Sequence, residues 1–368
     1  MTPRVQLIRA IERIWSDKGI VSTMLLPFSW LTQFVVGRKI ARYKKNPGLI
    51  WKSNRPIIVI GNIYVGGTGK TPVVIALVEF LTQCGWHPGV VSRGYGVQIG
   101  SQARTGQGAL DAGQFGDESA LIARTTGAPV SVHPSRVKAG QALLENYPDV
   151  DVIVADDGLQ HLALGRDIEI IVQDTRGIGN GRLLPAGPLR EPSIKLTQVD
   201  AVVTNGQTNP DAGPITTFQT TDTGTGPVHV CMTLAPLEAV HVKTGRSYPW
   251  AAWLSLHSDT PLSAVAAIGH PERFFTMLRR QGLTVQNTRA LPDHTAYTPS
   301  AFSNLGTQII LITTKDAVKC AGLNDDRLWA VRVVPKFSEP DWLDRIHDSL
   351  IKIAERKHHD GSDDKALN

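Results

Sequence analysis

The residues best suited to chemistry form a glycine-rich turn followed by a lysine and a threonine. The turn follows the apolar run 56–60, and the apolar positions of 72–83 recur after it with helical spacing. In such a unit, glycines let backbone N–H groups face an anion, the helix N-terminus adds positive charge, and the lysine reaches the terminal phosphates. We therefore predict a nucleotide phosphate-binding loop made of Tyr64, Val65, Gly66, Gly67, Thr68, Gly69, Lys70 and Thr71.

One position departs from the common spacing of this loop. Tyr64 stands where the first glycine of the G-x-x-x-x-G-K-[ST] pattern belongs. The plainer alternative is a glycine-rich turn that joins a strand to a helix and binds no ligand. A second signal, elsewhere in the chain, is therefore needed.

That signal is acidic. A buried strand predicted at 150–155 ends in Asp156 and Asp157. Carboxylates at a strand end beside a phosphate loop suit Mg²⁺ and its water ligands, and the Thr71 hydroxyl is placed for the same ion. His161 follows at the same edge of the sheet, where ligands bind in open α/β folds, although a lone histidine in a turn is more often structural.

From residue 56 onward, short apolar strands alternate with helices, which predicts an α/β fold with a mostly parallel, helix-covered sheet. The length allows two domains of ordinary size. We expect five segments: an N-terminal helical element at 1–55, a phosphate-loop core at 56–225, a β linker at 226–260, a smaller α/β domain at 261–356 and a disordered tail at 357–368.

Composition limits the class of protein. Of the 368 residues, 42% are hydrophobic and 19% are charged, which is typical of a globular chain with a real core. Only three cysteines occur, far apart, so no disulfide framework or clustered zinc spacing exists and we expect a reducing compartment. Residues 1–55 hold 11 Lys and Arg against 2 Asp and Glu, although the whole chain has a net charge of only +5. The basic end predicts contact with an anionic surface.

The N-terminal segment combines this charge with apolar residues. Its apolar stretches hold four aromatic residues, Trp15, Phe28, Trp30 and Phe34. The run 20–36 is too short and too polar for a confident membrane span, and a basic cluster follows at 38–45. We expect a helical hairpin lying in the lipid headgroup layer. The alternative is a hairpin packed on the domain with a solvated basic face.

Two further stretches carry charge. The Gly/Pro-rich segment 179–191 contains Arg190 and Glu191. Loops of this kind on a rigid sheet often bind substrate. A surface loop with solvated charges is an equally good interpretation of this segment. Lys315 and Asp316 are adjacent, whereas a guanine-reading signal spaces its lysine and aspartate by one residue. That adjacency counts against GTP and favours a feature of a strand end instead.

Taken together, the motifs resemble tetraacyldisaccharide 4′-kinase, the lipid A kinase of Gram-negative bacteria. The matching stretches run in order along most of the chain: GNIYVGGTGKTP (61–72), SRGYG (92–96), GDE (116–118), DDGLQH (156–161), LPAGPLRE (184–191), GHPERFF (269–275), DH (293–294) and TKDAVK (314–319). The loop of this family also commonly lacks the first glycine, so Tyr64 fits the resemblance.

The resemblance implies a kinase that transfers the γ-phosphate of ATP to the 4′-hydroxyl of a tetraacylated glucosamine disaccharide 1-phosphate in lipid A biosynthesis. It implies two α/β domains joined by a β linker, with an N-terminal helical element on the membrane. ATP and Mg²⁺ would be the cofactors. Lipid A disaccharide 1-phosphate and the cytoplasmic face of the inner membrane would be the partners, with no nucleic acid, and we expect a monomer.

The resemblance also implies catalytic roles. Asp117 would be the base for the hydroxyl, paired with His294 from the second domain, and His270 is the rival histidine. Asp156 would orient this pair or hold water on the metal. The metal ligands would be Thr71, Asp157 and Glu118.

The disaccharide site would be lined by Arg93, Tyr95, His161, Arg190 and Glu191. An arginine suits a sugar phosphate because its guanidinium donates in a planar fork. Arg136 is a further possible phosphate contact, with a solvated arginine at a helix N-terminus as the equal alternative.

Two other functions stay open from the residues alone. A phosphate-loop ATPase or GTPase acting as a switch would need ordered switch loops but no base–histidine pair from a second domain. A nucleic-acid-dependent NTPase would need aromatic platforms interleaved with basic residues, whereas here the aromatics lie within an apolar run. Phosphorylation of a lipid acceptor separates the three.

Overall fold

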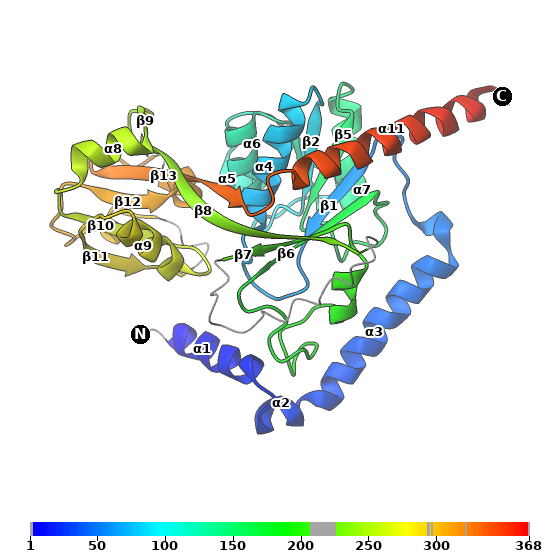
Figure 1. Cartoon of the computed structure of the whole chain (residues 1–368), viewed down its shortest axis with the longest axis horizontal. Coiled ribbons are helices and arrows are strands. Elements are labelled where there is room, and N and C mark those ends of the chain that lie inside the picture. The colour runs from blue at the N-terminus through cyan, green and yellow to red at the C-terminus, as the bar shows by residue number, and fades with distance from the viewer. Residues whose placement is uncertain (1–2, 207–225, 293–294, 296, 321, 367–368) are drawn as a thin grey trace.

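The computed structural model describes residues 3–206, 226–292, 295, 297–320 and 322–366. Within these residues a single sheet runs through two lobes (Figure 1). Its strands are β1 (Ile57–Gly61), β2 (Pro88–Ser92), β3 (Arg104–Gly106), β4 (Val130–Val132), β5 (Val152–Asp156), β6 (Ile168–Asp174), β7 (Ala201–Asn205), β8 (Val228–His241), β9 (Ser247–Pro249), β10 (Leu262–Ala266), β11 (Val285–Ala290), β12 (Ile310–Thr313) and β13 (Leu328–Phe337). Their order is β11-β10-β12-β13-β8-β7-β6-β1-β5-β2-β4-β3, with β9 paired to β8. The predicted α/β class with a large, mostly parallel sheet is confirmed.

Helices lie on both faces of this sheet and along one side of the molecule (Figure 1). The α-helices are α1 (Pro3–Ser16), α2 (Ile20–Met24), α3 (Leu26–Lys45), α4 (Lys70–Gln83), α5 (Ala112–Phe115), α6 (Asp117–Thr126), α7 (Arg136–Asn146), α8 (Trp250–His257), α9 (Pro271–Arg280), α10 (Thr314–Cys320) and α11 (Trp342–Ala366). Short 3₁₀ helices are η1 (Pro47–Leu49), η2 (Ser193–Thr197) and η3 (Pro299–Phe302).

The first lobe is centred on β1, which is parallel to β5 on one side and to β6 on the other. All five β1 residues are buried, because apolar layers cover both faces of the strand. Ile58 and Ile60 pack in the cluster that contains α4, and Ile57 and Val59 pack in the opposite cluster with α7. Parallel pairing brings the carboxyl ends of β1, β5 and β6 to one edge. The phosphate loop and Asp156 meet there.

The two lobes share β8. Its first part pairs in parallel with β7, and its second part pairs antiparallel with β13 of the second lobe. The segment 226–260, expected as a β linker, contains β8 and β9, and its last part, Trp250–His257, forms the helix α8. Trp250 and Trp253 lie three residues apart, which is helical spacing, and both are buried against the second lobe.

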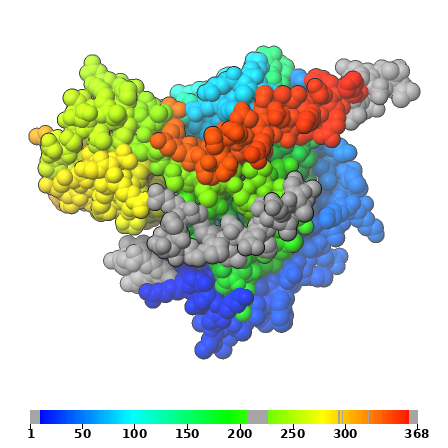
Figure 2. All heavy atoms as spheres, viewed as in Figure 1, coloured from blue at the N-terminus to red at the C-terminus, as the bar shows by residue number. Residues whose placement is uncertain are grey.

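The last helix returns to the first lobe, as Figure 2 shows. The apolar side chains Trp342, Ile346, Leu350 and Ile353 are buried in the core that contains α4. Beyond them, Lys357 Nζ lies 3.0 Å from Asp167 and donates to the Ser53 carbonyl at 2.9 Å. The expected unstructured tail at 357–368 is therefore wrong for most of its length, since these contacts hold α11 and it continues to Ala366.

The N-terminal element is helical, as expected, and its helices α1, α2 and α3 lie along one side of the first lobe (Figure 1). Polar contacts dock it on the Gly/Pro-rich segment: Ser22 Oγ donates to the Ala186 carbonyl at 2.6 Å, and Ser29 Oγ donates to the Leu183 carbonyl at 2.7 Å. Across the described residues, none of the helices combines the length and apolarity needed to cross a bilayer.

Candidate active site

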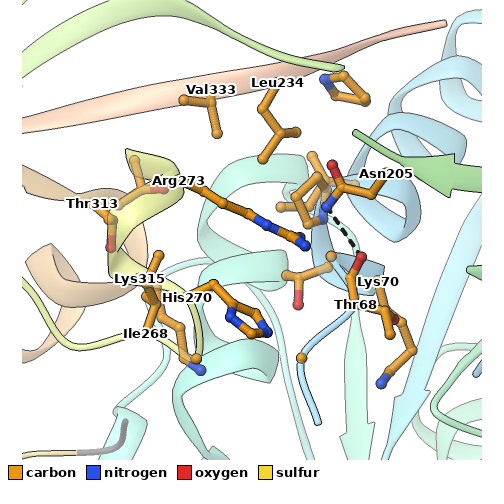
Figure 3. A pocket seen from close by; sticks show the side chains of 18 of the residues that line it. Thr68, Lys70, Asn205, Leu234, Ile268, His270, Arg273, Thr313, Lys315 and Val333 are labelled. Carbon is orange, nitrogen blue, oxygen red and sulfur yellow. Dashed lines mark hydrogen bonds between the residues drawn. The ribbon is translucent and has the colours of Figure 1, made fainter. Parts of the chain in front are cut away.

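A cavity of about 1690 Å³ lies between the two lobes (Figure 3). One wall is formed by the phosphate loop, the first turns of α4 and the carboxyl end of β5. The facing wall is formed by the second lobe, through the turn before α9, α9 itself and the start of α10. Lining residues of the first wall that sequence reasoning predicted are Val65, Gly66, Gly67, Thr68, Gly69, Lys70, Thr71, Arg93, Tyr95, Glu118, Asp156, Asp157 and Arg190.

The phosphate loop is held in shape by two asparagines. Asn62 Nδ2 donates to the carbonyls of Tyr64, at 2.7 Å, and Gly66, at 3.1 Å. Asn205, at the end of β7, donates from Nδ2 to the Thr68 carbonyl at 3.1 Å, the bond dashed in Figure 3. A Cβ at Gly69 (φ +92°) would stand 2.3 Å from the same Nδ2 atom. Only glycine fits here, so the loop backbone keeps its anion-binding form.

Lys70 opens α4 and is paired across the loop. Its Nζ lies 3.3 Å from Asp157 Oδ1, and Arg190 Nη1 lies 3.5 Å from the same oxygen. Burial acts to raise the pKa of Asp157, but the charges of Lys70 and Arg190 outweigh it and the pKa is lowered. Asp157 therefore carries a negative charge. Its carboxylate could bind a cation, such as a phosphate-bound metal, in place of Lys70 and Arg190.

Asp156 has a different environment. Its side chain is buried and accepts a hydrogen bond from Ser92 Oγ at 3.2 Å. Burial, followed by the neighbouring Asp157 charge, raises the pKa of Asp156 to about 6. Beneath both residues, the buried Arg136 donates from Nη2 to the Asp157 carbonyl at 2.9 Å, so its side chain braces this turn instead of being a solvated arginine.

The oxygen donors at this wall fit Mg²⁺. Thr71, Asp156, Asp157 and Glu118 all line the cavity, and carboxylate and hydroxyl oxygens are the ligands this ion prefers. Among the described residues, His, Cys, Asp and Glu do not form a cluster of three or more that could hold a metal alone.

Asp117 and Glu118 open α6 and are held by the second lobe. Lys319 Nζ lies 2.9 Å from Asp117 Oδ2, and Lys315 Nζ lies 2.7 Å from Glu118 Oε1. The two lysines are four residues apart on α10, so they point the same way from one helix face. At the start of α6, a Cβ on Gly116 would meet the Tyr95 carbonyl at 2.9 Å. The GDE and SRGYG stretches are therefore packed against each other at this point.

His294 lies outside the described residues. His270 lines the second wall, where burial and the charges of Arg176 and Arg273 lower its pKa. The charged groups acting on His270 belong to the Arg176 cluster and not to α6, so the structure gives no support to a pairing of His270 with Asp117.

Other predicted site residues lie behind the first wall. Tyr64 is buried beneath the Arg176 guanidinium, 4.3 Å from its ring centroid. Glu191 is buried and accepts a hydrogen bond from Gln160 Nε2 at 2.7 Å, and burial raises the pKa of Glu191. His161 is half-buried, and burial together with nearby cationic groups lowers its pKa to about 4. In this structure these three side chains support the wall; their predicted ligand contacts stay predictions.

Sequence reasoning missed the cationic character of the second wall. The sequence favours a strand-end feature over a nucleobase reader for Lys315, and it assigns no role to Lys319 or Arg273. Asp174 was also missed, although it ends β6 beside β1 just as Asp156 ends β5. A second acidic strand end next to the loop strand was a signal that could have been used.

Comparison with known proteins agrees with this geometry. The family model for tetraacyldisaccharide-1-P 4′-kinase matches residues 21–351. The chain is 50% identical over 359 residues to a tetraacyldisaccharide 4′-kinase of Bordetella petrii, covering 96% of this chain and 100% of that protein. It is 51% identical to that of Bordetella parapertussis, covering 94% and 97%. A crystal structure described as the apo form of LpxK from Aquifex aeolicus in complex with ATP aligns with a TM-score of 0.73 at 26% identity, covering 91% and 99%.

Proposed function

We propose how this chain works from the premise that it belongs to the tetraacyldisaccharide-1-P 4′-kinase family. It is an ATP-dependent kinase of lipid A biosynthesis that phosphorylates the 4′-hydroxyl of a tetraacyldisaccharide 1-phosphate. The observation that carries the mechanism is the position of the phosphate loop, which faces cationic side chains of a second lobe across one cavity. Phosphoryl transfer depends on positioning and charge neutralisation, and both walls can supply them.

The triphosphate of ATP would lie along the loop, with its β- and γ-phosphates on the backbone N–H groups of 66–71 and on Lys70. Lys70 would then exchange Asp157 for phosphate. Thr71 and Asp157, with Glu118 or Asp156 directly or through water, would hold Mg²⁺, which when bound neutralises charge on the phosphates. The loop needs no rearrangement for this, because Asn62 and Asn205 already fix its backbone.

Asp117 would accept the proton of the 4′-hydroxyl. The sugar oxygen then bonds to the γ-phosphorus while the bond from that phosphorus to the β–γ bridging oxygen breaks, and ADP leaves. Lys319 holds Asp117 at the lobe junction at 2.9 Å, and His294, as predicted from the family resemblance, would assist when the lobes close. Arg93, Tyr95 and Arg190 line the cavity and would face the disaccharide.

The N-terminal helices would place the chain on the cytoplasmic face of the inner membrane. Their polar residues Ser22 and Ser29 are buried against the first lobe, whereas eight large apolar residues of α2 and α3 are exposed. These exposed residues are Ile20, Val21, Met24, Phe28, Trp30, Leu31, Phe34 and Val35. A helix that turns its apolar side outward beside a basic cluster fits an anionic lipid surface better than water.

The function is tested by incubating the purified full chain with Mg-ATP labelled at the γ-phosphate and a tetraacyldisaccharide 1-phosphate in mixed micelles. We expect label to appear at the 4′-position of the lipid and ATP consumption to depend on that lipid. ATP hydrolysis at equal rates with and without the lipid, and no labelled lipid, would instead support a switch ATPase.

The membrane placement is tested separately with Trp30→Ser/Phe34→Ser, which leaves the docking residues Ser22 and Ser29 in place. We expect weaker sedimentation with vesicles containing anionic lipid, and unchanged ATP affinity. As the matched control, Leu237→Ser removes an exposed apolar side chain from β8, far from these helices in sequence. Equal vesicle binding by the double variant and the wild type would remove the helices from the proposal.

A further inference from the structure

Arg273 of α9 extends from the second lobe into the cavity, toward the side that carries the phosphate loop (Figure 3). Its Nη2 atom lies 3.1 Å from Asp174 Oδ2, and 40% of its side chain is exposed. Asp174 belongs to the first lobe, so this contact crosses between the lobes. Arg273 thus lines a phosphate-binding cavity and is held there by one buried carboxylate. It is therefore a candidate to contact a nucleotide bound in the cavity.

Asp174 already has a dedicated partner. Its side chain is 1% exposed, and Arg176 is bound to it through Nη2 at 2.8 Å and through Nε at 3.0 Å to both carboxylate oxygens. The Arg176 backbone N–H also donates to Asp174 Oδ1 at 3.0 Å. Asp174 would therefore remain compensated if Arg273 moved away. The second guanidinium is surplus to the needs of this buried charge.

The same cluster touches the phosphate loop. Arg176 Nη2 donates to the Gly67 carbonyl at 3.4 Å, and its guanidinium covers the ring of Tyr64. Glu12 of α1 is more distant, 3.9 Å from Arg176 Nη1. Two guanidiniums against one close carboxylate give a local excess of positive charge beside the loop, which attracts an anion.

The N-terminus of α9 adds to the positive potential in the cavity. Gly269 and His270, directly before the helix, line the cavity together with Arg273, so the positive end of α9 faces the cavity from the second lobe. Phe274 and Phe275, the next two residues, are buried in the second-lobe core and fix the first turn of the helix. Arg273 is therefore a flexible cationic side chain on a rigid base.

We propose that Arg273 is a catalytic residue that moves from Asp174 to the γ-phosphate of bound ATP and stabilises the charge of the transferring phosphoryl group. The proposal rests on the proposed kinase function and adds a residue to it. In the absence of nucleotide, Asp174 binds the Arg273 guanidinium and keeps it beside the phosphate loop. A planar, always charged fork suits the equatorial phosphate oxygens, and preorganised charge of this kind is a large term in phosphoryl transfer.

The test compares Arg273→Ala and Arg273→Lys with the wild type in lipid-acceptor phosphorylation at saturating Mg-ATP, together with the affinities for ATP and ADP. We expect kcat to fall about 10²-fold or more in the alanine variant, with a partial recovery in the lysine variant, because lysine keeps the charge but loses the fork. ATP affinity should fall more than ADP affinity, or kcat alone should fall if the contact forms only in the transition state.

Arg279→Ala is the matched control, since it removes the same charge from an exposed position of α9 that is outside the cavity lining. If the melting temperature shows that Arg273→Ala does not fold, Arg273→Gln replaces it. Wild-type kcat in the alanine or glutamine variant would overturn the proposal, as would equal losses of ATP and ADP affinity with kcat unchanged. If the wild type itself transfers no phosphate to the lipid, the proposed function has failed and not this inference.

Discussion

The two walls of the cavity differ in the groups that they present, backbone on one side and side chains on the other. The first wall is mainly backbone: a glycine loop whose carbonyls are held by Asn62 and Asn205, so that its N–H groups are fixed before any ligand arrives. The second wall contributes long cationic side chains of another lobe, among them Arg273 and Lys315, and Lys319 of the same lobe binds Asp117. A backbone cradle binds phosphate in any lobe arrangement, whereas side chains from the other lobe act only at the right separation. The first wall should therefore decide nucleotide binding, and the second should decide turnover.

Removing the lysine of the first wall should have the larger effect. Lys70→Ala should lower kcat/KM for ATP about 10²- to 10³-fold, because a preorganised positive charge is lost where the triphosphate charge is greatest. Steady-state kinetics with varied ATP, alongside direct measurement of ATP affinity, gives the result. Both affinity and turnover should fall. A variant that keeps wild-type ATP affinity would show that the loop does not hold the terminal phosphates.

The second-lobe lysine that pairs with Asp117 should affect turnover and not ATP binding. Lys319→Ala removes the ammonium 2.9 Å from Asp117 Oδ2 and should lower kcat about 10- to 100-fold, since the carboxylate loses the contact that positions it. The KM for ATP should change little, and Lys319→Arg should recover part of kcat. Lys336→Ala, at an exposed position of β13, is the control. A loss confined to KM for ATP would contradict the division between the walls.

The smallest expected effect concerns the support behind the first wall. The folded-state pKa of His161 is about 4, below its ordinary value of 6.5, because of burial and nearby cations. Between these values the unfolded chain binds a proton here that the folded chain does not, so His161 costs stability as the pH falls through this window. His161→Gln should therefore lose less melting temperature than the wild type between pH 6.5 and 4.5. An identical loss in both proteins would show that His161 is not held neutral.

The first wall could be predicted from sequence because its signals are local. The strand, the glycines and Lys70 lie within a few residues of each other, and the predicted strand at 56–60 and helix at 72–83 match β1 and α4 closely. Asp156 and Asp157 were also predicted, since an acidic strand end is visible in the chain itself. What local signals could not show is that Asp157 pairs with Lys70 and that Asp156 is buried.

The second wall depends on packing between distant segments, which one sequence does not report. Lys319 and Asp117 are separated by most of the phosphate-loop lobe and by β8. The spacing of Trp342, Ile346 and Leu350 indicates an amphipathic helix, but it does not say that the helix returns to the first lobe. The same holds for β8, whose alternating pattern predicts a strand and not that one strand joins both lobes in a single sheet.

Above all, we propose that Asp117 accepts the proton of the lipid hydroxyl at the junction of the two lobes, where Lys319 contacts it beside the cavity. The most direct measurement is single-turnover phosphate transfer to tetraacyldisaccharide 1-phosphate by Asp117→Asn at saturating Mg-ATP, with ATP affinity measured on the same protein. We predict transfer slowed about 10²- to 10⁴-fold with ATP affinity essentially unchanged. Transfer at the wild-type rate would contradict the claim.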